Sequence, residues 1–253
     1  MDGTRRFDSF DGTSIVWHEL GEGRPLVLIH GYFSDANTNW IKYGHAAILA
    51  EAGFRVIMPD LRAHGQSGRP HDAAAYPADA LAMDAEALIA HLNLDAGGYD
   101  LGGYSLGART VVRVLARGHA PAPRRVILSG MGLEGLLDTG ARAGHFRRVL
   151  TGLGSHARGT PEWMAEAFLK TTGGDPVALL GILDTFVDTP HDAIAGIGQP
   201  VLVAAGVDDD DNGSHAALAD LLPDARLVEV PGNHMSAVTK RELGEAIRDF
   251  LTA

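Results

Sequence analysis

The segment 100–109, DLGGYSLGAR, is the feature that most restricts how this 253-residue chain can fold. It places Ser105 between Gly103 and Gly107, after an apolar run and before a helical pattern. A sharp turn from a strand into a helix strains its central residue, and large side chains two positions away would collide with the backbone there. The two glycines avoid that collision. The segment therefore predicts a turn that exposes the Ser105 hydroxyl beside a helix N-terminus, where free N–H groups favour negative charge.

Continuous apolar runs that alternate with helical patterns predict the rest of the fold. Strands are expected at 26–29, 54–58, the run that enters Ser105, 125–129, 200–206 and 226–230. Helices are expected at about 40–52, 78–91, 106–117, 214–222 and 237–251. Segments 6–10 and 14–20 flank Asp11-Gly12 and predict an antiparallel hairpin at one edge. The fold class predicted is α/β, with a mostly parallel eight-stranded sheet and helices on both faces.

The alternation fails between residues 131 and 195. This stretch holds several short helical patterns, such as 161–169 and 177–186, and no clear strand. We interpret it as a helical cap inserted into one core. The predicted organisation is therefore a core of residues 1–130 and 196–253 with a cap of residues 131–195.

Composition excludes several classes of function. The net charge of −11 argues against a nucleic-acid partner, which requires a basic surface. The absence of cysteine excludes disulfides, thiol nucleophiles and thiolate metal sites, and the 12 histidines show no close helical pairing, so we expect no metal and no cofactor. No apolar run approaches the about 20 residues of a membrane helix, and no apolar leader follows Met1, so a cytoplasmic protein without a membrane partner is expected. The oligomeric state is left open.

Polar residues follow the predicted strands at their carboxyl ends, where parallel sheets place their binding sites. These residues are His30, Ser105, the run Asp208 to Asp211, and His234. A serine, an acid and a histidine in this chain order are typical of one class of hydrolases.

These motifs together resemble the α/β-hydrolase superfamily, and in particular its small serine esterases and cofactor-free haloperoxidase-like hydrolases. The resemblance covers nearly the whole chain outside the cap. It depends on His30-Gly31, the segment 60–67 (DLRAHGQS), the segment 103–107 (GYSLG), the segment 206–209 (GVDD) and the segment 232–234 (GNH). One departure is Ala63, where the family usually has glycine, and this puts the shape of that loop in question.

The resemblance implies a role for each of these residues. Ser105 would be the nucleophile and His234 its general base. The acid that orients the histidine would be Asp209, with Asp208 and Asp210 as alternatives. The backbone N–H groups of Leu106 and Tyr32 would form the oxyanion hole, with Phe33 as an alternative to Tyr32.

Further residues are expected around this centre. Phe33 and Tyr104 are candidate substrate contacts. His30 and His64 are expected to brace their own loops, as are Asp60 and Arg62. Arg109 is expected to be a framework cation.

The predicted reaction is hydrolysis of a small to medium carboxylic ester or lactone through an acyl-enzyme on Ser105. A serine excludes the dehalogenase and epoxide hydrolase reactions of the same fold, which use an aspartate at this position. A carbon–carbon bond hydrolase, a perhydrolase and a nearly non-catalytic ligand receptor remain as alternatives.

Overall fold

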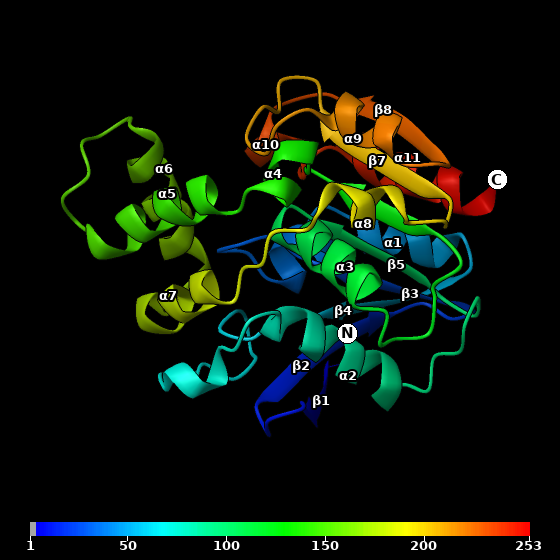
Figure 1. Cartoon of the computed structure of the whole chain (residues 1–253), viewed down its shortest axis with the longest axis horizontal. Coiled ribbons are helices and arrows are strands. Elements are labelled where there is room, and N and C mark those ends of the chain that lie inside the picture. Colours follow the sequence, from blue (N-terminus) through cyan, green and yellow to red (C-terminus); the bar gives the residue numbers. More distant parts are fainter. Residues whose placement is uncertain (1–3) are drawn as a thin grey trace.

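The computed structural model describes residues 4–253 (Figure 1). Its eight strands form one sheet, in the order β1-β2-β4-β3-β5-β6-β7-β8. The first pairs, β1 with β2 and β2 with β4, are antiparallel, and the remaining pairs are parallel. The strands are β1 Thr4–Asp8, β2 Ser14–Leu20, β3 Arg24–Ile29, β4 Phe54–Pro59, β5 Asp100–Tyr104, β6 Val126–Ser129, β7 Val201–Gly206 and β8 Ala225–Val230. This architecture confirms the predicted fold class.

Helices cover both faces because the central strands are apolar on both sides. In β3, Leu26 and Leu28 pack into one hydrophobic cluster, whereas Val27 and Ile29 pack into the other. The first cluster includes residues of α1 (His45–Glu51) and α11 (Arg241–Thr252). The second includes residues of α2 (Ala80–His91), α3 (Leu106–Arg117) and α9 (His215–Leu221). Alternation of buried side chains along a strand thus divides the core into two layers.

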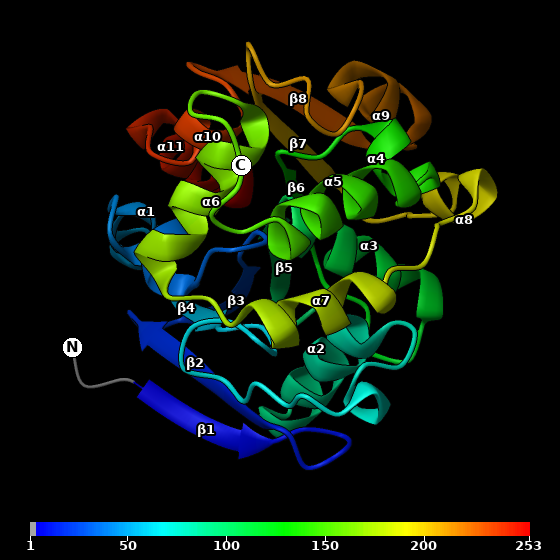
Figure 2. The same cartoon turned by 90° about the vertical axis from the view of Figure 1, so that its left-hand side faces the viewer.

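A helical segment separates β6 from β7. It contains α4 (Leu133–Leu137), α5 (Gly140–Thr151), α6 (Pro161–Thr172), α7 (Pro176–Asp184) and α8 (His191–Ala195). Helices α5, α6 and α7 project beyond the sheet at one end (Figure 1), and they stand in front of the strands when the molecule is viewed from that end (Figure 2). Thr160 and Asp175 cap α6 and α7, each followed by a proline in the first turn. We refer to residues 131–195 as the insertion.

Three predicted elements are wrong in detail. The expected helix at 40–52 is two pieces, a π-helical turn (Asn37–Ile41) and α1, because Gly44 between them takes a left-handed φ of 85°. The expected helix at 237–251 is likewise divided into α10 (His234–Ala237) and α11, because Lys240 is extended. The first strand is β1, Thr4–Asp8, and begins before the predicted range of 6–10.

Two glycines allow β5 and α3 to pack closely. A Cβ atom on Gly107 would lie 2.1 Å from the carbonyl oxygen of Ile29, and one on Gly103 would lie 2.2 Å from the carbonyl carbon of Gly107. Both contacts are with backbone atoms, which cannot rotate away. Helix α3 can therefore rest on β3 and β5 only while both positions lack a side chain.

We expect Gly107→Ala to destabilise the fold by about 3 kcal/mol or more, because the added methyl must push α3 away from β3. Urea unfolding measures the change. Gly198→Ala is the matched control, since nothing lies within 4 Å of a Cβ at that exposed position. Equal stabilities of the two variants would contradict the prediction.

Candidate active site

Ser105 lies at the tip of the turn between β5 and α3. Its φ of 53° and ψ of −111° place it in a conformation that residues other than glycine seldom adopt. Its N–H donates to the carbonyl of Ser129 on β6 at 2.8 Å, and its side chain makes no capping bond to α3. The turn thus leaves the hydroxyl free to interact with groups above the sheet.

His234 connects Ser105 to Asp209. Its Nε2 lies 3.0 Å from the Ser105 Oγ, and its Nδ1 lies 2.9 Å from one carboxylate oxygen of Asp209. The imidazole stands at the first position of α10, where Asn233 and Ser236 form a reciprocal capping box. The Tyr104 hydroxyl donates to the His234 carbonyl at 2.6 Å. One hydrogen-bonded chain therefore joins Ser105, His234 and Asp209, which are far apart in sequence.

The four adjacent aspartates have different environments. The Asp209 carboxylate is fully buried and accepts a hydrogen bond from the Asp211 N–H at 3.2 Å. Asp208, Asp210 and Asp211 are exposed, and Asp211 pairs with Arg142 of α5 at 2.6 Å. Among these four aspartates, the one that is hydrogen-bonded to the His234 ring is Asp209.

The pKa of Asp209 lies below its usual range. Burial raises that pKa, but the hydrogen bond and charge of His234, with the Asp211 N–H, lower it by more. His215 lies near the same carboxylate, with its Nε2 3.8 Å from Asp209, and burial lowers the pKa of His215. Asp209 is therefore charged at neutral pH and adjoins two imidazoles.

The loop after β3 lies beside Ser105. A Cβ atom on Gly31 would be 3.5 Å from the Ser105 Cβ, and the Gly31 N–H is held by the Asn39 side chain at 2.9 Å. Within residues 4–253, neither Tyr32 nor Leu106 donates its N–H to another backbone carbonyl. The family resemblance implies these two N–H groups for an oxyanion hole, with the N–H of Phe33 as an alternative to that of Tyr32, and this role stays a prediction.

The side chains of Tyr32 and Phe33 are buried against the insertion. The rings stack on each other at 4.4 Å, and Phe146 of α5 meets them edge-on at 4.7 Å and 5.1 Å. The Tyr32 hydroxyl donates to the Leu179 carbonyl of α7, and the Thr172 hydroxyl of α6 donates to the Phe33 carbonyl. All three projecting helices thus hold this loop.

The two candidate substrate contacts lie in different surroundings. Phe33 is buried in the aromatic cluster just described. Tyr104 is also buried, and it packs in the hydrophobic cluster on the α1 and α11 face of the sheet, with its ring 5.4 Å from that of His234. Tyr104 contacts His234 directly, and contact of either residue with a substrate stays a prediction.

Sequence reasoning missed several residues around the site. They are Asn39, which holds Gly31; Arg142, which holds Asp211; Phe146, which packs on the loop; and His215, which adjoins Asp209. Asn39 and Arg142 belong to no motif. The signal that could have found Phe146 was its place as an aromatic residue in the insertion.

His30 and His64 brace the loops beneath the site. His30 Nε2 accepts the Leu61 N–H, while its Nδ1 lies 2.8 Å from the Gly31 carbonyl, which fixes the neutral form. Burial lowers the pKa of His30, and burial together with the neighbouring His30 lowers the pKa of His64 to about 3.

The turn that contains Arg62 is held by ion pairs from the Arg62 guanidinium to Asp11 and Asp84, as expected. Ala63 keeps a φ of 67°, the left-handed conformation that a glycine would adopt there.

Arg109 is buried on α3 without a carboxylate within ion-pair distance among the residues described. Its Nη2 donates to the Gly135 carbonyl at 3.0 Å, and its guanidinium covers the Phe186 ring. Burial lowers the pKa of Arg109 to about 10.

Across residues 4–253, no cluster of three or more His, Asp or Glu side chains could hold a metal ion. No helix in that range is long and apolar enough to span a membrane.

Comparisons with known proteins agree with this fold. Residues 24–142 match the family model for the alpha/beta hydrolase fold. The chain is 35% identical over 123 residues to a non-heme haloperoxidase of Rhodococcus erythropolis, covering 47% of this chain and 41% of that protein. The segments matched in the curated relatives span less than half of those relatives' lengths.

Solved structures match over the whole chain. A hydrolase from Pseudomonas aeruginosa PA01 superimposes with a TM-score of 0.80 at 22% identity, covering 100% of this chain and 99% of that one. The esterase RhEst1 from Rhodococcus sp. ECU1013 gives 0.74 at 26% identity, covering 99% of both chains. The chain therefore has the α/β-hydrolase fold. Its predicted resemblance to that superfamily, with esterases and haloperoxidases among the similar proteins, is confirmed.

Buried neutral histidines make stability depend on pH. Below about pH 6.5 the unfolded chain binds protons that the folded His64 does not, so the free energy of unfolding should fall as the pH is lowered. Urea unfolding at pH 8 and pH 5 measures this loss. We expect His64→Gln to be less stable than wild type at pH 8 but to lose less stability on acidification. The exposed His191→Gln should keep the wild-type loss. A His64→Gln loss equal to that of wild type would contradict the assignment.

Proposed function

We propose that this protein is a serine hydrolase that cleaves small to medium carboxylic esters or lactones through an acyl-enzyme on Ser105. The observation that carries the proposal is the hydrogen-bonded chain from the Ser105 Oγ through His234 to the buried Asp209. A serine hydroxyl is a weak nucleophile until an adjacent base removes its proton. Here the base is within reach of the hydroxyl, and a carboxylate fixes its tautomer.

The proposed reaction has two halves. Ser105 attacks the substrate carbonyl while His234 Nε2 takes the hydroxyl proton, and Asp209 stabilises the imidazolium. The imidazolium then protonates the leaving alcohol. Water, activated by the same imidazole, releases the acid from the acyl-enzyme.

The oxyanion formed in each half would accept hydrogen bonds from the N–H groups of Leu106 and Tyr32. Leu106 begins α3, so its N–H has no partner within the helix. Loss of one such donor typically costs about 3 kcal/mol of transition-state stabilisation. The insertion would act as a cap, because its three projecting helices hold the loop of Tyr32 and Phe33.

We expect Ser105→Ala to lower kcat by about 10⁴-fold or more on short p-nitrophenyl esters and on lactones. It should also abolish covalent labelling by a fluorophosphonate, detected by intact-protein mass spectrometry. Ser155→Ala, at an exposed serine of the insertion, is the control and should retain both.

Other results of these assays would refute the mechanism or favour one of the alternative functions. Ester hydrolysis that survives Ser105→Ala would refute the mechanism. Wild-type protein that neither reacts with the fluorophosphonate nor turns over any ester or lactone would favour a ligand receptor. Carbon–carbon bond cleavage or peracid formation faster than ester hydrolysis would favour the other two alternatives.

The identity of the acid is tested separately. We expect Asp209→Asn to lower kcat by about 10³- to 10⁴-fold, because the amide cannot hold the required tautomer or stabilise the imidazolium. Asp208→Asn, at the exposed neighbour, should change kcat by no more than about twofold. Steady-state kinetics on one p-nitrophenyl ester, with melting temperatures as a folding check, compare the two. Similar losses in both variants would contradict the choice of Asp209.

A further inference from the structure

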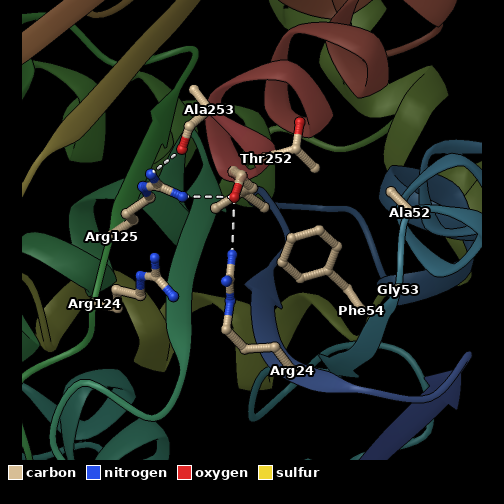
Figure 3. A pocket seen from close by; sticks show the side chains of 9 residues that line it. Arg24, Ala52, Gly53, Phe54, Arg124, Arg125, Thr252 and Ala253 are labelled. Carbon is tan, nitrogen blue, oxygen red and sulfur yellow. Dashed lines mark hydrogen bonds between the residues drawn. The ribbon is translucent and has the colours of Figure 1, made fainter.

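The pocket in Figure 3 lies away from the candidate active site. It opens where β3 and β4 begin, whereas Ser105 follows the end of β5. Two of its arginines, Arg24 and Arg125, donate to main-chain oxygens of residues 251 and 253. Among the residues described, no side chain that lines this pocket has a buried polar atom without a hydrogen-bond partner. The pocket therefore holds no buried group that needs a ligand to satisfy it.

Beside the proposed triad, by contrast, lies a buried imidazole nitrogen without a hydrogen-bond partner. It is the Nε2 atom of His215, the first residue of α9. This atom lies 3.8 Å from the Asp209 Oδ2, which is longer than a hydrogen bond but within ion-pair distance. The His215 side chain is largely buried and that of Asp209 is fully buried. The acceptor that the structure places before this nitrogen is therefore the Asp209 carboxylate.

The two oxygens of the Asp209 carboxylate are unequally satisfied. Oδ1 lies 3.1 Å from the His234 Nδ1 and also accepts the Asp211 N–H at 3.2 Å. Within residues 4–253, Oδ2 has the His234 ring as its one hydrogen-bond partner, at 2.9 Å. A carboxylate can accept about four hydrogen bonds, and a buried charge is costly unless it is hydrogen-bonded. Oδ2, the oxygen nearer to His215, therefore has capacity for a second donor.

The start of α9 is held by contacts that do not involve the His215 ring. The Ser214 Oγ accepts the Ala217 N–H at 3.0 Å and so caps the helix. The Ser214 N–H donates to the Glu134 carboxylate of α4 at 2.6 Å. His215 follows directly in the chain, so these contacts fix its place beside the acid loop. Replacement of the ring should therefore leave α9 in position.

His215 is neutral in the folded protein at neutral pH. Helix α9 packs against α4, β7 and β8, and β7 carries no titratable side chain. Asp209, Glu134 of α4 and Glu229 of β8 act to raise the pKa of His215, whereas burial and His234 lower it, and burial is the largest effect. The pKa of His215 therefore lies below its usual range. A neutral imidazole carries its proton on one nitrogen, and a carboxylate oxygen opposite Nε2 favours a proton on Nε2.

We propose that His215 is a positioning residue, which donates from Nε2 to the Asp209 Oδ2 and holds the carboxylate in the orientation that His234 requires. The inference rests on the proposed function, in which Asp209 stabilises the His234 imidazolium. A second donor on Oδ2 opposes rotation of the carboxylate about its Cβ–Cγ bond while His234 gains and loses its proton. Because His215 is neutral, it does this without competing for the negative charge.

The nitrogen chemical shifts of the imidazole rings in the wild-type protein test this tautomer without any measurement of activity. We expect the His215 ring to carry its proton on Nε2 at neutral pH. Loss of the signal in His215→Gln identifies it. A His215 proton on Nδ1 would overturn the proposal, whether or not the protein hydrolyses an ester.

Steady-state kinetics on a p-nitrophenyl ester test the positioning. We expect His215→Leu to lower kcat by about tenfold and to leave KM within about twofold, because it removes a donor to a charged group that does not touch the substrate. His215→Gln keeps a neutral N–H donor and should retain most of the wild-type kcat. In the Asp209→Asn background, His215→Leu should cause no further loss, since His215 acts through Asp209.

His191→Leu is the matched control, because His191 is also the first residue of a short helix, α8, but is exposed. It should keep the wild-type kcat, and melting temperatures check that each variant is folded. Three kinetic results would overturn the proposal: a wild-type kcat in His215→Leu, equal losses in His215→Leu and His215→Gln, or a further tenfold loss in the Asp209→Asn background. Wild-type protein without ester or lactone turnover would count against the proposed function instead, and the tautomer would still decide whether His215 donates to Asp209.

Discussion

The close approach of α3 to the sheet is the constraint on which the rest of the site depends. Gly107 brings the first turn of α3 against the carbonyl of Ile29, and Gly103 accommodates Gly107 in turn. The chain can reverse so sharply only if Ser105 takes a left-handed φ. Such strain costs of order 1–3 kcal/mol and persists only when the surroundings impose it. The sheet and α3 together impose it here, and the strain presents a hydroxyl beside a helix N-terminus.

The proposed oxyanion loop depends on the insertion as much as on the sheet. Below it, His30 and Asn39 hold the backbone around Gly31. Above it, α5, α6 and α7 each contact Tyr32 or Phe33. A loop fixed from both sides holds its N–H groups in place before a substrate arrives, and such preorganisation makes electrostatic stabilisation effective. Changes in the insertion would therefore alter the proposed chemistry as well as the choice of substrate.

Sequence patterns predicted the central strands well because strands such as β3, β4, β6 and β7 are apolar runs bounded by glycine and polar residues. They placed Ser105 and the run of aspartates after β5 and β7, which are buried on both faces, and His234 after the edge strand β8, which is largely exposed. The choice of Asp209 within that run came from the family resemblance. The break of the first predicted helix at Gly44 was not found, because one left-handed glycine interrupts an otherwise helical pattern. Contacts such as Arg142 with Asp211 join residues that no local period relates. Tertiary geometry alone brings those residues together.

The acid loop shows how the insertion and the proposed triad are connected. The Asp211 N–H donates a hydrogen bond to the Asp209 carboxylate, and the Asp211 side chain forms an ion pair with Arg142. Asp211 therefore links the buried carboxylate to α5. The next residue, Asn212, donates its side-chain amide to the Gly130 carbonyl, and its own carbonyl accepts the Gly135 N–H. The root of the insertion and the acid loop are therefore one hydrogen-bonded unit. Because the Asp209 carboxylate hydrogen-bonds to the His234 ring, the Arg142–Asp211 pair connects α5 through this unit to the imidazole that we propose as the base for Ser105.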